Sequence, residues 1–215
     1  YQESLDYLYG LQKFGIKLGL ENIRTLLSRL EHPEKRYKSI LVAGTNGKGS
    51  IASALAAILQ HAGYRTGLYT SPHLHSFNER VRVDGEMIPD ARIVSLVAEM
   101  QLHAGSIPLT FFEFTTALAL QYFAEQEVDV AVLEVGLGGR LDATNAVAPV
   151  LSVIASIAAD HQLHLGESLT QIAREKAGIM RPGVPAVSSM QEPEARDALI
   201  SAAEEIGTEV MFCGT

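Results

Sequence analysis

A glycine-rich segment at residues 44–50 most constrains how this sequence can fold. It reads Gly-Thr-Asn-Gly-Lys-Gly-Ser, follows an apolar run at residues 40–43 and precedes an alanine- and leucine-rich stretch at residues 50–61. The short run predicts a buried strand, and the spacing of the later apolar residues predicts a helix. The segment therefore predicts a strand, a glycine loop and a helix in succession.

This order of elements is typical of a phosphate-binding loop, because N–H groups at a helix start carry partial positive charge and glycines let a polyphosphate approach. Lys48 would reach the β and γ phosphates, and the hydroxyl of Thr45 or Ser50 would contact Mg²⁺ or a phosphate oxygen. The spacing departs from the common G-x-x-x-x-G-K-[ST] loop, and a glycine-rich surface turn is the alternative. The predicted ATP-binding residues are Thr45, Asn46, Gly47, Lys48, Gly49 and Ser50.

The rest of the chain alternates apolar runs with helical patterns. Strands are predicted at residues 67–70, 128–134, 150–156, 184–188 and 209–213. Helices are predicted at residues 90–102, 114–126, 168–177 and 193–206. Such alternation predicts an α/β fold with a mostly parallel sheet flanked by helices.

Two segments depart from this alternation. The first 30 residues space their leucines at near-helical intervals and are broken by glycines, which predicts two short helices around a glycine-rich loop. Asp84-Gly85 lies between alternating residues and predicts a small β-hairpin insert.

Composition limits the class of protein. The chain has 215 residues, of which 47% are hydrophobic, so it can bury the core of one large α/β domain. With 17 basic and 25 acidic residues its net charge is −8, which argues against a general nucleic-acid or membrane-surface partner. No long uncharged apolar run or signal-peptide pattern is found, and the single cysteine suits a reducing compartment, so we expect a soluble cytoplasmic protein.

Two acidic or imidazole groups follow predicted strands. Glu134 ends the run at residues 128–134, and ligands of open α/β folds collect at the carboxyl ends of strands. A carboxylate there is a candidate Mg²⁺ ligand or simply an acidic residue at the strand end. His161, next to Asp160, follows the run at residues 150–156 and is a candidate metal ligand or a structural, solvated histidine.

Other polar groups allow two interpretations each. Lys176 lies at a predicted helix end, where a lysine usually faces water and complements the helix dipole. Asp142 and Asn145 would orient a substrate or hold an Asx turn. The loop at residues 70–80 would meet an anionic substrate or be an ordinary loop; its polar side chains include Ser71, His73, Asn78 and Arg80.

In order, these motifs resemble the N-terminal ATPase domain of the folylpolyglutamate synthase/dihydrofolate synthase branch of the Mur ligase family. The resemblance runs from about residue 7 to the last residues. Its most specific segments lie at residues 17–20, 43–50, 70–74, 134–145, 160–161 and 174–179. The resemblance implies a P-loop Mur-ligase-type ATPase fold that uses ATP and Mg²⁺.

The resemblance also implies a reaction. Members phosphorylate a carboxylate of a folate or dihydropteroate with ATP, and the amine of L-glutamate then attacks the acyl phosphate to form an amide. Lys48, His161 and Lys176 would be catalytic, with Lys176 at the position that the family carbamylates. Ser71, Glu134 and His161 would bind Mg²⁺. The substrate would lie near Thr110, Phe112, Asp142 and Ala143.

The family has a second domain that contacts glutamate. We therefore expect residues 1–215 to form the ATP-binding domain, with the C-terminal glutamate-ligase domain of the same polypeptide outside this chain. The alternatives are an ATP-binding fragment without ligase activity on its own, or a related Mur ligase that activates another carboxylate. Residues 110–114 and 141–145 favour a folate over a nucleotide-linked muramoyl substrate.

Overall fold

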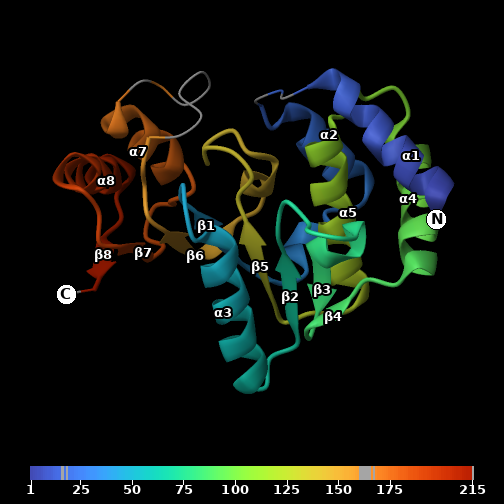
Figure 1. Cartoon of the computed structure of the whole chain (residues 1–215), viewed down its shortest axis with the longest axis horizontal. Helices are drawn as coiled ribbons and strands as arrows, with labels where there is room; N and C mark the ends of the chain where they lie inside the picture. Colours follow the sequence, from blue (N-terminus) through green and yellow to red (C-terminus); the bar gives the residue numbers. More distant parts are fainter. Residues whose placement is uncertain (16, 18, 160–165, 167, 215) are drawn as a thin grey trace.

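The computed structural model describes residues 1–15, 17, 19–159, 166 and 168–214, and within them an eight-stranded sheet forms the centre of the molecule (Figure 1). The strand order is β4-β3-β2-β5-β1-β6-β7-β8, and all neighbours from β2 to β8 are parallel. The strands are β1 (Lys38–Ala43), β2 (Thr66–Tyr69), β3 (Val81–Val83), β4 (Glu86–Met87), β5 (Val130–Glu134), β6 (Pro149–Ile154), β7 (Ala186–Ser189) and β8 (Val210–Cys213).

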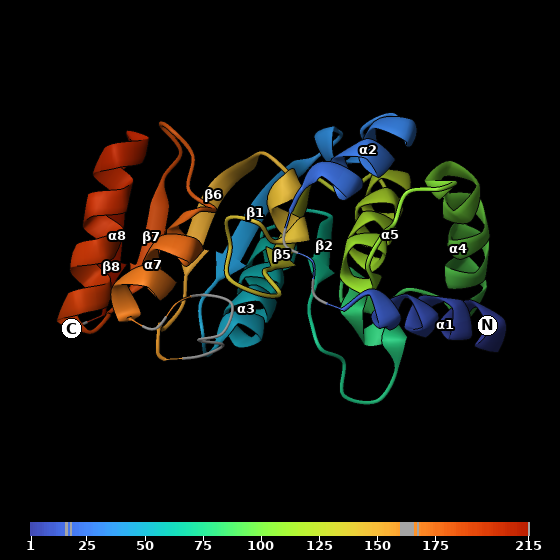
Figure 2. The ribbon, with the colours of Figure 1, turned by 90° about the horizontal axis from the view of Figure 1, so that it is seen from above.

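Helices cover the sheet and fill the connections between strands. The α-helices are α1 (Gln2–Gly10), α2 (Glu21–Arg29), α3 (Lys48–His61), α4 (Asp90–Ala104), α5 (Phe111–Glu125), α7 (Leu169–Ala177) and α8 (Pro193–Ile206). Short 3₁₀ turns are η1 (Leu11–Phe14), η2 (Pro33–Lys35), η3 (Phe77–Arg80) and η4 (Ala143–Ala146). Figure 2 shows α1, α2, α4 and α5 gathered at one end of the sheet, and α7 with α8 at the other.

The two faces of the sheet bury different sets of side chains. In β1, Ile40 and Val42 pack with Ala52 of α3, whereas Leu41 and Ala43 belong to the larger core that contains α5. Successive strand residues point to opposite faces, so a strand buried on both sides must be apolar throughout. This explains why β1 and β5 appear in the sequence as continuous apolar runs.

The predicted α/β fold with a mostly parallel sheet is confirmed. The predicted hairpin is also present: β3 and β4 pair antiparallel, with Asp84 at φ 52° and Gly85 at φ 84° in the two-residue turn between them. Both residues need positive φ in the turn type that matches strand twist, which Asp-Gly tolerates. Helix α3 begins at Lys48, two residues earlier than predicted, because Gly47 at φ 80° ends the loop.

No helix in the described residues is both long and apolar enough to cross a membrane.

Two glycines let the loop after β5 pack against the end of α7. A Cβ on Gly139 would lie 2.7 Å from the carbonyl oxygen of Glu175, and a Cβ on Gly178 would lie 2.3 Å from the Cβ of Arg140. Arg140 N–H donates to the Glu175 carbonyl over 2.9 Å, and the two side chains form an ion pair. This close backbone approach fixes where α7 presents its last turn.

Replacing Gly178 by alanine should lower the free energy of unfolding by about 1–3 kcal/mol, because the added methyl group overlaps the Arg140 backbone and side chain. Gly10→Ala is the matched control, since a Cβ at Gly10 meets nothing within 4 Å. Urea denaturation measures both variants. Equal unfolding midpoints for the two alanine variants would contradict the packing argument.

Candidate active site

The loops at the carboxyl ends of the central strands form the candidate site. β1 ends at Ala43 beside Ile154 of β6, and Val42 pairs with Glu134 at the end of β5. β2 lies on the other side of β5. Because parallel strands end at one edge, the loops that follow β1, β2, β5 and β6 meet there.

The loop after β1 is held against the end of β6. Gly44 has φ +147°, and a Cβ there would lie 2.6 Å from the Cβ of Ala155, so only glycine fits. Thr45 N–H donates to the Ser156 carbonyl over 2.8 Å. The Thr45 hydroxyl donates to the Ala158 carbonyl and accepts from its N–H, both at 3.1 Å. The Thr45 hydroxyl therefore stabilises the loop itself.

The predicted loop residues continue into the first turn of α3. Asn46 and Gly47 are exposed, and Lys48 opens the helix with its Nζ donating to the Thr45 carbonyl over 3.2 Å. Ser50 is also exposed in this turn, so its hydroxyl is the more accessible of the two considered from the sequence. Because Gly47 offers no side chain to cap the helix and a lysine opens it, this helix start favours an anion.

Glu134 lies between the helix start and the loop after β2. Its Oε2 accepts from Ser71 N–H over 2.9 Å, and its carboxylate also accepts from Gly49 N–H. Burial raises the pKa of the Glu134 carboxyl, although these N–H groups and the charges of Lys48 and Arg80 oppose the rise. Ser71 and Glu134, predicted as metal ligands, are thus neighbours; His161 lies outside the described residues.

Lys176 is buried, contrary to the water-facing alternative. It is 2% exposed, and its Nζ donates to the Gly44 carbonyl over 2.8 Å. The sequence places it at a helix end, where a lysine is normally solvated. The packing of Gly139 and Gly178 turns this end of α7 inward, toward the loop after β1.

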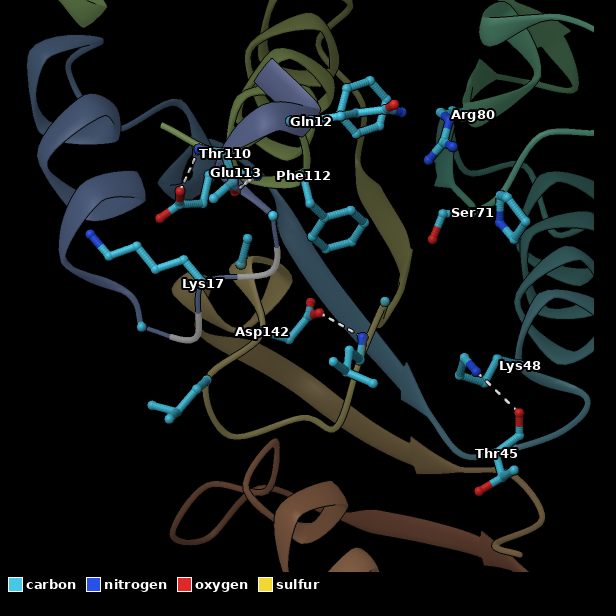
Figure 3. Close-up of a pocket in the computed structure, with 18 residues that line it drawn as sticks. Gln12, Lys17, Thr45, Lys48, Ser71, Arg80, Thr110, Phe112, Glu113 and Asp142 are labelled. Atoms are coloured by element: carbon cyan, nitrogen blue, oxygen red, sulfur yellow. Dashed lines mark hydrogen bonds between the residues drawn. The ribbon is translucent and has the colours of Figure 1, made fainter. Parts of the chain in front are cut away.

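One cavity of about 610 Å³ joins the glycine loop to an aromatic wall (Figure 3). Thr45, Lys48 and Ser71 line one part of it, and Phe112 lines another. A Cβ on Gly136 would lie 2.6 Å from the Phe112 ring, so this glycine lets the ring sit against the loop after β5. All four predicted substrate-binding residues line this cavity, namely Thr110, Phe112, Asp142 and Ala143.

Two of these four residues also hold backbone in place. Thr110 caps α5: its hydroxyl accepts from Glu113 N–H over 3.2 Å, and Glu113 Oε2 accepts from Thr110 N–H over 2.8 Å. Asp142 accepts from Leu137 N–H over 2.9 Å, and from the N–H and hydroxyl of Thr144. Burial raises the pKa of the Asp142 carboxyl, opposed by these hydrogen bonds. Asp142 therefore forms the predicted Asx turn while lining the cavity.

Sequence reasoning missed some lining residues and left others open. Gln12 and Glu113 line the cavity without having been singled out; the Thr-x-x-Glu capping spacing was the available signal for Glu113. Arg80 also lines it, whereas the Asn78 amide donates to the Ile88 carbonyl and to Asp90. Of the polar side chains in that loop, Asn78 is thus structural.

Comparison with known proteins agrees with this geometry. Residues 42–214 match the Mur ligase middle domain, and the chain belongs to that family. Its relatives include the dihydrofolate synthase/folylpolyglutamate synthase of Bacillus subtilis, 44% identical over 211 residues, with 95% of this chain and 49% of the relative covered. The Escherichia coli enzyme of the same name is 44% identical over 203 residues, with 94% and 48% covered.

Solved structures give the same result. Escherichia coli FolC in complex with DHPP and ADP superposes with a TM-score of 0.91 at 42% identity, covering 99% of this chain and 51% of that one. The apo form of L. casei FPGS superposes with a TM-score of 0.93 at 40% identity, covering 99% and 53%. The chain spans about half the length of the curated relatives it matches.

The buried carboxyl of Asp142 should give the stability of the protein a pH dependence. Its pKa in the folded protein lies above the ordinary value of 3.8, so in the pH range between these two pKa values the folded protein binds more protons than the unfolded chain. The stability of the protein therefore falls as pH rises from about 3.8 through the raised pKa. Asp142→Asn cannot titrate. Urea denaturation between about pH 4 and about pH 8 should show wild type losing stability relative to this variant as pH rises; a constant difference would contradict the assignment.

Proposed function

We propose that this chain is the ATP-binding part of a ligase that joins L-glutamate to the carboxylate of a folate or dihydropteroate. One observation carries the proposal: a single cavity extends from Lys48 and Thr45 to Phe112 and Asp142. A nucleoside triphosphate at the glycine loop and a flat aromatic acid against Phe112 would both fit in this cavity. The names of the similar proteins, which include dihydrofolate and folylpolyglutamate synthases, support the same substrate class.

The glycine loop and Lys48 would hold the phosphates of ATP. Gly47 leaves the start of α3 without a side-chain cap, and the Lys48 ammonium donates to the Thr45 carbonyl there. The names of similar structures support a nucleotide here, since one contains ADP and another AMPPCP.

The residues around Glu134 fit a divalent cation. Among the described residues, no ion pair joins this buried carboxylate to a side chain, and its hydrogen bonds come from backbone N–H groups. Glu134 and Ser71 would hold one Mg²⁺. His161 would hold a second, which Lys176 in carbamylated form would orient. Mg²⁺ neutralises phosphate charge and favours phosphoryl transfer when bound.

The reaction then needs placement more than covalent help from the protein. A carboxylate oxygen of the substrate attacks the γ-phosphorus of ATP, and the bond to ADP breaks with its electron pair leaving on ADP. The glutamate amine attacks the resulting acyl phosphate, and inorganic phosphate leaves as the amide forms. Lys48 neutralises charge at the phosphates, and Phe112 with Asp142 fixes the aromatic acid beside them.

The full-length protein should release phosphate from ATP only when both glutamate and dihydropteroate or tetrahydrofolate are present. Lys48→Ala should reduce this rate by at least about 100-fold, because a charge that stabilises the transferring phosphoryl group is lost. Lys38→Ala, which changes an exposed lysine at the opposite end of β1, is the matched control. Release that is independent of both pterin acids would refute the folate assignment; release with another carboxylic acid would favour a different Mur ligase.

Lys176 offers an independent readout. Intact-mass analysis at neutral pH, with peptide mapping, should find the mass of one CO₂ added at Lys176, and Lys176→Ala should lose phosphate release. Bicarbonate depletion should lower the activity of wild type reversibly. Full activity of the Lys176→Ala variant would contradict a role at the metal.

A second candidate is a nucleotide-binding module that does no ligation by itself. This candidate is favoured because the chain spans only about half the length of its relatives. Calorimetric titration of the 215-residue chain with Mg-ATP separates the two. Binding without turnover supports the module, and glutamate ligation by this chain alone would refute it.

A further inference from the structure

Arg80 is a buried cation that forms no ion pair with a carboxylate in the described part of the chain, although its charge acts on the Glu134 carboxyl. The residue ends η3 and is 7% exposed. Its Nε donates to His73 Nδ1 over 2.7 Å, and its guanidinium carbon lies 5.3 Å from the centre of the Phe111 ring. Among the described residues, its two terminal nitrogens form no ion pair and donate no hydrogen bond.

Such an arrangement indicates that an anion belongs beside Arg80. Burying most of a guanidinium weakens its hydration, and one aromatic face, one imidazole and the charge of Glu134 compensate in part. The part of Arg80 that lines the cavity remains open to an anion. The two terminal nitrogens of arginine form a planar fork that matches the two oxygens of a carboxylate or of a phosphate.

The position of Arg80 in the cavity distinguishes between these anions. Figure 3 shows Arg80, Ser71 and Lys48 in that order along one side of the cavity, with Phe112 across from Arg80 and Ser71. Lys48 belongs to the glycine loop, whereas Arg80 lies at the aromatic end and packs against Phe111. An aromatic acid that lies against Phe112 would therefore present its carboxylate to Arg80, on the far side of Ser71 from Lys48.

We propose that Arg80 binds, through its two terminal nitrogens, the substrate carboxylate that accepts the phosphoryl group. The inference rests on the proposed function and adds a residue to it. His73 is a positioning residue: by accepting the Nε–H, it fixes the plane of the guanidinium, and its ring lies 3.5 Å from the Tyr9 hydroxyl. Arg80 also offsets the repulsion between the carboxylate and the γ-phosphate before one oxygen attacks phosphorus and ADP leaves.

The test compares dihydropteroate with its carboxamide, which has the same rings but no charge to pair with Arg80. Calorimetry on the full-length protein should show that wild type binds the acid at least about tenfold more tightly than the amide. Arg80→Gln should abolish this preference. Arg82→Gln should keep the preference. It also removes one positive charge, but Arg82 lies in β3 and lines a different hollow, near Ser53 and Gly85.

Several results would overturn the inference. Wild type that binds acid and amide equally, or an Arg80→Gln variant that keeps the preference, would do so without affecting glutamate-dependent phosphate release, so the proposed function would survive. Should thermal denaturation show that Arg80→Gln does not fold, Arg80→Lys, which keeps the charge without the fork, must weaken the preference. Weaker binding of Mg-ATP but not of ADP in either variant, with the preference intact, would assign Arg80 to the γ-phosphate instead. Absence of both acid binding and phosphate release in wild type would refute the proposed function and this inference with it.

Discussion

The hydrogen bond from Lys176 Nζ to the Gly44 carbonyl joins two segments that are far apart in the sequence. A buried N–H group is costly unless its proton is accepted, so this contact favours keeping the start of the glycine loop and the last turn of α7 together. That contact requires the loop after β5 to pass close to α7, which Gly139 and Gly178 permit. The glycine loop, the loop that carries Asp142 and α7 therefore form one packed unit.

The side chains that line the cavity beside this unit differ in charge and polarity from one end to the other. Lys48 at the glycine loop and Arg80 near the aromatic end lie along one side, and Lys17 lines the cavity across from them. Phe112, supported by the bare backbone of Gly136, provides an apolar surface. The charges of Lys48 and Arg80 both act on Glu134, since both oppose the rise in the pKa of its carboxyl. This order of side chains suits the proposed reaction, in which a phosphoryl group passes from a nucleotide at one end to a flat aromatic acid at the other.

The parts of the fold that depend on local pattern were predictable. The strand, loop and helix around Lys48 follow from adjacent residues, and β5 ends at Glu134, as predicted, shortly before the glycine-rich segment at residues 136–139. The burial of Lys176 was not predictable from its helix, because it results from glycine contacts between distant loops. That Arg80 forms no ion pair among the described residues could not be read from the sequence either, since it depends on where the fold places the carboxylates. His161 remains a sequence prediction.

The capping box of α5 has a consequence for redesign. Thr110 and Glu113 satisfy each other's backbone N–H groups and also line the cavity, so the same atoms define a helix terminus and part of a recognition surface. Losing such a cap typically costs about 1 kcal/mol. Directed evolution for a new ligand would thus meet a stability–activity trade-off on this wall. Leu141 and Ala143 line the same cavity without capping a helix, so substitutions there would change selectivity without the loss of a cap.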